Sequence, residues 1–526
     1  MDSKRFLFFA LVFFLVLSFA AACGDDDDDD DQSASDDDDD NDDDTSGPAS
    51  DDDDNDDVTP PLACEAEVEP VNSDNPLSRK VVVTCNERAA ISGFVTTPGE
   101  EGVGFSDPPI SETGLTHFIW FYGLLEDTTY DLIVHEAGET TALAHASFTT
   151  PTLPGWLPQL QDYRVAEDAD PGYWISAVNN TPGESVFPTR VLIVFDRQAR
   201  PRFVHEMPLA GEFHPLQSQV VFSNGDIGVS TTTNLVGVKK NGKAYRLFNL
   251  ALQEGYFRPA HHQFYVADRE AEMAMVLYND LGPGVQCDLT TPTDEAVGDG
   301  VVFVGREGEE IWRWSVFDHA DVIRPDMMNP FVCYNFHFGP GKYDWTHGNG
   351  VIPVPGETAV LISLRNVLQL VKVDVLTGDV IWQMGPDLDF TWLGDEPEMD
   401  RWFRMQHDPV YVTPTRLLIL DNGNCRYNFN CLDGPWTRAL EIEIDEDAMT
   451  VTQVWEHRVD FSHAQGNVQR LANGNTLIYN GWQGQFWEVT HDHQEVMYGA
   501  FSAVQKTFDL RSYPALWDYD AEPPVK

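Results

Sequence analysis

A recurring strand end organises most of this chain. Six strand-like segments each end in a pair of apolar or aromatic residues, and the second members of successive pairs lie 41, 67, 70, 73 and 42 residues apart. A unit of about 40 residues with four short strands is typical of a β-propeller blade, which buries its faces only against neighbouring blades. The pairs are Phe203-Val204, Ala244-Tyr245, Ile311-Trp312, Ile381-Trp382, Val454-Trp455 and Val496-Met497.

The repeat predicts an all-β fold with a six-bladed propeller over residues 151–526. Almost no stretch has a helical period, and short β-rich runs fall between the repeated pairs. The three longer spacings leave room for insertions of roughly 25 to 30 residues in loops. Seven blades and a double sandwich are the alternatives, but a double sandwich does not produce six similar strand ends.

Residues 64–150 predict a separate, small β-sandwich ahead of the propeller. Short β-rich runs alternate with turn residues, as in Lys80–Thr84 and Thr116–Phe121. Leu124, Thr128, Tyr130 and Val134 have the spacing of the tyrosine corner found in fibronectin III-like sandwiches. Prolines 151, 154 and 158 then predict a stiff linker.

The N-terminus has the pattern of an export signal. Basic Lys4 and Arg5 precede an apolar run that ends in small residues directly before Cys23. We therefore expect residues 1–22 to be a lipoprotein signal peptide, Cys23 to be lipidated, and the chain to be exported and anchored at the cell envelope. Plain cleavage and secretion is the alternative. The choice among periplasm, outer membrane and cell surface stays open.

Residues 23–63 predict a disordered tether. This segment contains 21 Asp between positions 25 and 57 and no basic residue there. Such a composition cannot bury enough apolar surface to offset chain entropy. The whole chain has a formal net charge of -55, which repels phosphate backbones and anionic headgroups. We expect no nucleic-acid partner and membrane contact only through the lipid anchor; the oligomeric state stays open, with a homodimer as one option.

Six cysteines besides Cys23 favour disulfides in an exported chain. No pair has the spacing of a zinc site, so no metal is expected. Sequence order favours three pairs among 15 possible connectivities. These pairs are Cys64–Cys85, Cys287–Cys333 and Cys425–Cys431.

Histidines recur shortly before blade strands, where loops of a propeller converge on one end of the channel. A ring of imidazoles there would titrate near neutral pH, although a single histidine is more often a polar cap than a catalyst. The histidines are His214, His261, His262, His347, His407 and His463.

Arg365 and two asparagines accompany these histidines. Asn349 follows His347 by two residues, and Ser363 to Asn366 end a strand-like run. A set of His, Asn and Arg without clustered carboxylates is a poor hard-metal site. It suits an oxyanion, because guanidinium offers paired donors and neutral imidazole can act as nucleophile or acid–base.

At these residues the chain resembles the bacterial PAPS-independent arylsulfate sulfotransferases, over about residues 155–504 and the sandwich before them. The family motifs DW-x-H-x-N, S-x-R-N and QH are matched by Asp344 to Asn349, Ser363 to Asn366, and Gln406-His407. An HH pair and a DNG element are matched by His261-His262 and by Asp421 to Gly423.

The resemblance implies an exported enzyme with a sandwich and a six-bladed propeller, needing no cofactor. It implies that His407 attacks sulfur of an aryl sulfate, giving a sulfohistidine that a phenol then discharges. His347, Asn349 and Arg365 would hold the sulfuryl oxygens. His261 or His262, between which the sequence does not decide, would complete the clamp or exchange a proton.

Further substrate-binding candidates are Trp345, Trp402, Phe403, Tyr427 and His463. The aromatic residues could equally be ordinary propeller core. Two other functions compete with sulfuryl transfer: a cell-surface propeller that binds a ligand without chemistry, and a sulfate-ester hydrolase. A calcium-dependent lactonase would need a ring of Asp, Asn and Glu that the repeat positions lack.

Overall fold

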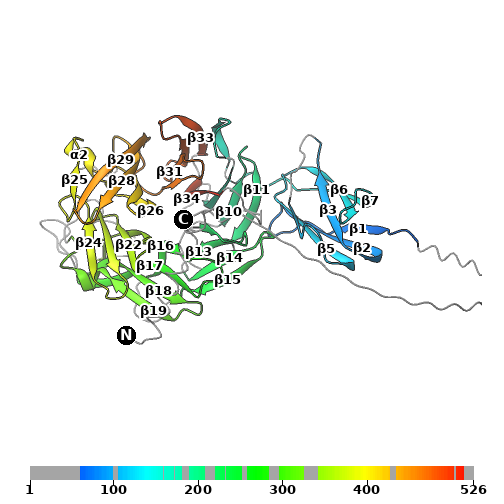
Figure 1. Cartoon of the computed structure of the whole chain (residues 1–526), viewed down its shortest axis with the longest axis horizontal. Coiled ribbons are helices and arrows are strands. Elements are labelled where there is room, and N and C mark those ends of the chain that lie inside the picture. The colour runs from blue at the N-terminus through cyan, green and yellow to red at the C-terminus, as the bar shows by residue number, and fades with distance from the viewer. Residues whose placement is uncertain are drawn as a thin grey trace, which may run out of the picture.

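The computed structural model places a small β-sandwich beside a ring of β-sheets (Figure 1). Its description covers twelve ranges of the chain, and the statements below concern these residues. They are 60–98, 105–157, 159–170, 172–180, 189–207, 219–231, 233–251, 258–283, 295–324, 342–426, 434–502 and 505–513.

The sandwich has two sheets with the strand orders β1-β2-β5-β4 and β3-β6-β7. These orders correspond to the ABED and CFG sheets of an immunoglobulin-like sandwich. The predicted sandwich over residues 64–150 therefore has the expected architecture. Its strands are β1 (Cys64–Val68), β2 (Arg79–Ala89), β3 (Ile91–Thr96), β4 (Phe105–Asp107), β5 (Gly114–Tyr122), β6 (Thr129–Glu136) and β7 (Ala142–Thr149).

The tyrosine corner is present at the start of β6. Tyr130 is fully buried, and its hydroxyl accepts a hydrogen bond of 2.8 Å from the backbone N–H of Leu125. Leu124 and Val134 lie in the same apolar core. The corner therefore ties the loop before β6 to the sandwich core.

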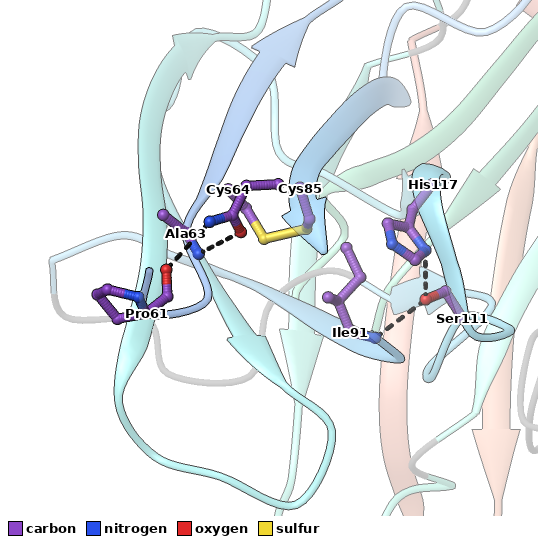
Figure 2. Close-up of a disulfide and its surroundings, with 8 residues drawn as sticks. Pro61, Ala63, Cys64, Cys85, Ile91, Ser111 and His117 are labelled. Atoms are coloured by element: carbon purple, nitrogen blue, oxygen red, sulfur yellow. Dashed lines mark hydrogen bonds between the residues drawn. A yellow bond between two sulfur atoms is a disulfide. The ribbon is translucent and has the colours of Figure 1, made fainter. Parts of the chain in front are cut away.

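One predicted disulfide is present between β1 and β2. Cys64 and Cys85 face each other in the strand register and are bonded (Figure 2). Near this bond, Ser111 accepts from the N–H of Ile91 and contacts Nδ1 of His117 at 2.8 Å. Cys425 is also disulfide-bonded. Cys287, Cys333 and Cys431 lie outside the described residues, as does Cys23.

Six sheets form the propeller in the described part of the chain, and we number them as blades from the N-terminal side. Blade 1 contains β34 (Gln505–Tyr513), β9 (Tyr173–Asn180), β10 (Thr189–Phe195) and β11 (Pro201–Met207). Blade 2 contains β12 (Gln219–Val221), β13 (Ile227–Ser230), β14 (Asn234–Val238) and β15 (Ala244–Asn249). Blade 3 contains β16 (Arg258–Tyr265), β17 (Met273–Pro283), β18 (Glu295–Gly305) and β19 (Glu310–Ser315).

The other three blades follow in chain order. Blade 4 contains β21 (Gly348–Pro353), β22 (Ala359–Leu364), β23 (Gln369–Asp374) and β24 (Val380–Met384). Blade 5 contains β26 (His407–Thr413), β27 (Arg416–Asp421), β28 (Thr437–Asp445) and β29 (Thr450–Val459). Blade 6 contains β30 (Asn467–Arg470), β31 (Thr476–Asn480), β32 (Gln485–Val489) and β33 (Glu495–Phe501).

The predicted repeat is confirmed strand by strand. The innermost strands contact one another around the channel: β16 with β21, β21 with β26, β26 with β30, β30 with β34, and β34 with β12. Each of the six predicted residue pairs lies on the fourth strand of its blade, namely β11, β15, β19, β24, β29 and β33.

Middle strands bury both of their faces between neighbouring blades. In β22, Val360 and Ile362 pack towards blade 3, whereas Leu361 packs towards blade 5. In β27, Leu417 packs towards blade 4 and Leu418 towards blade 6. Since successive side chains point to opposite faces, such strands require continuous apolar runs.

The ring is closed from both ends of the propeller sequence. The C-terminal strand β34 pairs antiparallel with β9 and forms the inner edge of blade 1. In return, β8 (Leu160–Val165) pairs with β33 at the outer edge of blade 6. Pairing of strands far apart in sequence leaves no gap in the radial packing.

The longer spacings contain added segments, as predicted. Before β21 the chain forms η1 (Val316–His319) and β20 (Lys342–Asp344), the latter pairing with β18. Before β26 it forms β25 (Thr391–Leu393) and α2 (Glu398–Arg401). Among the described residues, no helix has the length and apolar character needed to cross a membrane.

The sandwich is docked on blades 1 and 2 through polar contacts to backbone atoms. Asn75 donates to the carbonyl of Lys240, and Arg202 donates to the carbonyl of Gly123. The backbone carbonyl of Asp74 lies 2.9 Å from Nδ1 of His205. These contacts fix the sandwich beside blades 1 and 2. The histidines of the sequence motifs lie on other blades.

We expect Tyr130→Phe to destabilise the sandwich while leaving the propeller folded. The change leaves the partly buried N–H of Leu125 without its acceptor, which costs about 1–2 kcal/mol. Urea denaturation followed by fluorescence should show one unfolding transition moved to lower urea. An unchanged transition would mean that this hydrogen bond adds nothing to stability.

Candidate active site

Three inner-strand irregularities bring polar side chains to one end of the channel. The pairing register shifts at His261 in β16, at Asn349 in β21 and at His407 in β26. A bulge of this kind re-aims side chains out of the regular ladder. His262, His347 and Asp408 also have positive φ angles of 53°, 49° and 48°. Such conformations are costly for residues other than glycine and cluster at functional sites.

Asn422 sets the orientation and tautomer of His407. Its side-chain N–H groups donate to the carbonyls of Ser462 and Gln465, each at 3.1 Å. Its amide oxygen therefore faces Nδ1 of His407, 2.6 Å away. Because this oxygen accepts, Nδ1 carries the proton and Nε2 keeps its lone pair. The backbone N–H of Gln465 lies 3.3 Å from Nε2.

The environment of His407 favours the neutral imidazole. Burial, the guanidinium charge of Arg365 and the neighbouring His347 lower its pKa to about 3, while the bond to Asn422 acts in the opposite direction. The side chain is therefore unprotonated at neutral pH. It is a buried nitrogen base whose nucleophilic atom is defined by one hydrogen bond.

Arg365 is a buried cation without an acidic partner. One guanidinium nitrogen donates to Asn366 at 3.1 Å and another to the carbonyl of His463 at 2.9 Å. Its Nε is buried and has no hydrogen-bond partner. Within the described ranges, no carboxylate forms an ion pair with it. Burial lowers the pKa of Arg365 to about 10, so it remains charged at neutral pH. An uncompensated buried cation is suited to an anionic ligand.

His262 and His347 contact each other beside His407. Their ring centroids are 5.0 Å apart in an edge-to-face arrangement. Nδ1 of His347 lies 2.6 Å from the buried carboxylate of Asp344, which leaves Nε2 of His347 directed away from this carboxylate. Burial, together with His347 and His261, lowers the pKa of His262 well below its usual value.

The structure distinguishes the two histidines of the HH pair. His261 lies with Nε2 3.1 Å from the carboxylate of Asp299 and Nδ1 2.9 Å from Nδ1 of His262. His262 lines the same cavity as His407, and His261 does not. The pair therefore forms a chain from a buried carboxylate to the cavity wall.

A polar cavity lies at this end of the channel. Asn349 contributes to its wall, with its amide N–H donating to the carbonyl of Gln406 at 2.7 Å and its Oδ1 buried without a partner. No apolar side chain among the described residues lines this cavity. Its lining residues are His262, Gln263, Asn349, His407, Asp408, Gln465, Gly466, Asn467, Asp509 and Arg511. In the described part of the chain, no three His, Cys, Asp or Glu residues are placed to hold a metal ion.

The predicted aromatic walls are not found at this cavity. Trp345 is buried in the core between blades 3 and 4, where its indole N–H donates to the carbonyl of Arg324. Trp402 and Phe403 pack in the core between blades 4 and 5. These side chains serve packing because the repeat places them between sheets. Tyr427 and His214 lie outside the described residues.

His463 contributes through its backbone. Its carbonyl accepts from Arg365 and from Asn424, and its ring packs edge-to-face on Trp482. Sequence reasoning did not identify Gln465, Asp408 or Arg511 as cavity residues. It noted Asn422 only within the DNG element, where its position after a strand was the available signal. Nothing in the sequence relates Arg511 to a site more than 100 residues away.

Comparisons with known proteins bear on the family of this chain. No curated protein matches it. Similar solved structures include a periplasmic gluconolactonase from Pseudomonas aeruginosa (TM-score 0.36, 10% identity, covering 81% of this chain and 99% of that chain). Virginiamycin B lyase from Staphylococcus aureus has a TM-score of 0.32 and 8% identity, with 67% and 99% of the two chains covered. At such low TM-scores we draw no conclusion from these similarities.

The family comparison is decisive. The profile of the family described as Arylsulfotransferase (ASST) matches residues 205–512, which is more than half of the chain. The match contains His262, His347, Arg365 and His407, and it extends to Arg511. It confirms the resemblance that the sequence motifs indicated. The chain belongs to the arylsulfotransferase family.

Proposed function

We propose that this arylsulfotransferase moves a sulfuryl group from an aryl sulfate to a phenol through a sulfohistidine at Nε2 of His407. The observation that carries the proposal is the pairing of a neutral, oriented imidazole with a buried guanidinium that has no carboxylate partner among the described residues. Nucleophile and anion-binding group thus share one site.

In the first step, the Nε2 lone pair attacks sulfur and the bond from sulfur to the aryl oxygen breaks. The aryl oxide leaves with the bonding electrons, which is feasible because its conjugate acid has a pKa near 10. Arg365 and Asn349 face the charge that develops on the sulfuryl oxygens, with His347 beside them. The product of this step is an N–S bonded sulfohistidine and a phenol oxide.

The acceptor's proton is assigned to His262. This residue lines the cavity with His407, and behind it lie His261 and the carboxylate of Asp299. Its lowered pKa leaves His262 neutral before the reaction, so the first phenol oxide departs without a proton from it. A carboxylate at the end of this chain stabilises a proton held on the histidine pair. In the second step the acceptor phenol gives its proton to His262, its oxygen attacks sulfur, and the N–S bond breaks; His262 then loses this proton to the released phenol oxide or to solvent.

We also propose that the chain works outside the cytoplasm, anchored through Cys23. Support comes from the N-terminal pattern and from the Cys64–Cys85 disulfide, since disulfides persist in oxidising compartments.

His407→Ala should abolish transfer from 4-nitrophenyl sulfate to phenol. Loss of the nucleophile should lower nitrophenol release at least about 10³-fold, because the variant lacks the Nε2 atom that forms the covalent intermediate. Release by the wild-type protein should depend on added phenol. Release without phenol would instead establish hydrolysis, and no release with any acceptor from folded protein would favour a binding propeller.

Arg365→Met should lower kcat about 10²- to 10³-fold by removing the cation that faces the sulfuryl oxygens. Arg416→Met is the matched control, because Arg416 pairs with Glu443 on the two middle strands of blade 5 and does not line the cavity. Steady-state measurement of kcat for both variants and wild type tests this expectation. Equal rates for Arg365→Met and wild type would contradict the role assigned to Arg365.

Activity should persist in moderate acid and fall only as pH approaches about 3, where His407 takes up a proton. The lowered folded-state pKa makes protonation favour the unfolded chain, so stability should decline as pH falls below about 6.5, the ordinary histidine pKa. Asn422→Asp should move the activity loss to higher pH, since a carboxylate on Nδ1 favours imidazolium. Circular dichroism at each pH shows whether activity is lost through unfolding or through protonation of His407. Identical activity–pH profiles for wild type and Asn422→Asp would contradict the role of Asn422.

A further inference from the structure

An ion cluster shares the cavity with the nucleophile and has no part in the steps above. It consists of Asp408, Asp509 and Arg511, all of which line the cavity. Arg511 lies 2.6 Å from Asp408 through Nη2 and 3.1 Å from Asp509 through Nε. With both carboxylates ionised, the three side chains carry one net negative charge.

The carboxylate of Asp408 and the backbone of Asp509 are held in place independently of the arginine. Asp408 directly follows His407, and its carboxylate also accepts from Gln263 at 3.3 Å and from the N–H of Val468 at 3.2 Å. Asp509 lies on β34, where the side-chain hydroxyl of Ser176 and the amide of Asn467 hold the neighbouring backbone. Removing the guanidinium would therefore leave both carboxylates inside the cavity.

An uncompensated carboxylate there would oppose the proposed chemistry. The donor is an anion, and like charges repel strongly where water is largely excluded. A further negative charge would also favour the imidazolium form of His407. The groups already facing His407 are Arg365, His347, Asn422 and the backbone of Met405. Burial lowers the pKa of Arg511, but Asp408 and Asp509 outweigh it and raise this pKa, so the guanidinium stays charged.

We propose that Arg511 is a positioning residue that pairs with Asp408 and Asp509 and offsets one of their two negative charges, so that the cavity beside His407 admits an anionic sulfate ester. The inference rests on the proposed function. It also assigns a second role to the strand that closes the propeller: β34 supplies the counter-ion for an acid that adjoins the nucleophile in blade 5.

A purely structural role is the competing explanation, and the chain offers a control for it. β34 is also held to blade 6 by side-chain amides that pair with its backbone. Gln469 donates to the carbonyl of Ser512 at 2.7 Å and accepts from its N–H at 2.9 Å. Gln469 does not line the cavity, so Gln469→Leu weakens the closure without changing the charge near His407.

The test compares four variants of the full chain: Arg511→Met, Arg511→Lys, the double variant Arg511→Met with Asp408→Asn, and Gln469→Leu. Initial rates with 4-nitrophenyl sulfate and saturating phenol give kcat and KM, and thermal unfolding gives Tm. Arg511→Met should raise the donor KM about tenfold or more and move the acid limb to higher pH. Arg511→Lys should retain most activity because it keeps the charge.

The double variant decides between charge and structure. It restores the net charge of the wild-type cluster without restoring the ion pair, so its KM should return to within about threefold of wild type. Gln469→Leu should lower Tm and leave KM unchanged. If Arg511→Met lowers only Tm, or if the double variant has the same raised KM as Arg511→Met, the inference is overturned.

A direct measurement keeps the inference separate from the proposed reaction. Carbon-13 NMR of labelled histidine, with the His407→Gln protein used for assignment, follows the His407 pKa without turnover. A higher pKa in Arg511→Met than in wild type supports the electrostatic role even if no sulfuryl transfer is observed. An equal pKa, in a folded variant, overturns it. Absence of turnover in wild type would count against the proposed function alone.

Discussion

Closure of the ring is the constraint on which this molecule depends. Every middle strand buries both faces between neighbouring blades, so an open ring would expose the flanks of blades 1 and 6. β34 and β8 close it by pairing with strands more than 300 residues away in sequence. Closure also determines the site, because it draws the inner strands of blades 3, 4, 5, 6 and 1 around one channel. Cavity residues from β16, β21, β26 and β34 meet only in the closed ring.

Equivalent positions in successive blades perform different tasks at the site. The bulges at His261, Asn349 and His407 lie near the starts of their inner strands. A bulge frees a side chain from the sheet without altering the outer strands that pack between blades. The fold can therefore vary chemistry at these points while keeping the apolar runs of strands such as β22 and β27. The positive φ angles of His262, His347 and Asp408 cost free energy, and the packed sheets around these residues hold them in this conformation.

Local sequence patterns predicted the fold well and the site in part. The repeated strand ends predicted six blades, because the fourth strand of each blade packs in a similar environment and so has a similar sequence. Short motifs singled out His407, His347, Arg365 and Asn349, which the fold brings to one end of the channel. Trp345 and Trp402 pack between blades and do not line the cavity; local sequence cannot separate these two placements, because aromatic residues beside motifs resemble both ligand walls and core. The choice between His261 and His262, and the contribution of Arg511, depend on contacts across blades, which no local spacing contains.

The electrostatics of the molecule separate into a long-range and a local part. The chain carries a formal net charge of -55, which repels an anionic sulfate ester at a distance. Salt screens that field over about 8 Å at physiological ionic strength. Inside the channel salt screens charges less, so the charged side chains that line it determine whether an anion can bind. There Arg365 has no acidic partner in the part of the chain that the structure describes, while Asp408 and Asp509 pair with Arg511. The same placement that admits an anion keeps His407 unprotonated, so binding and nucleophilicity arise from one distribution of charge.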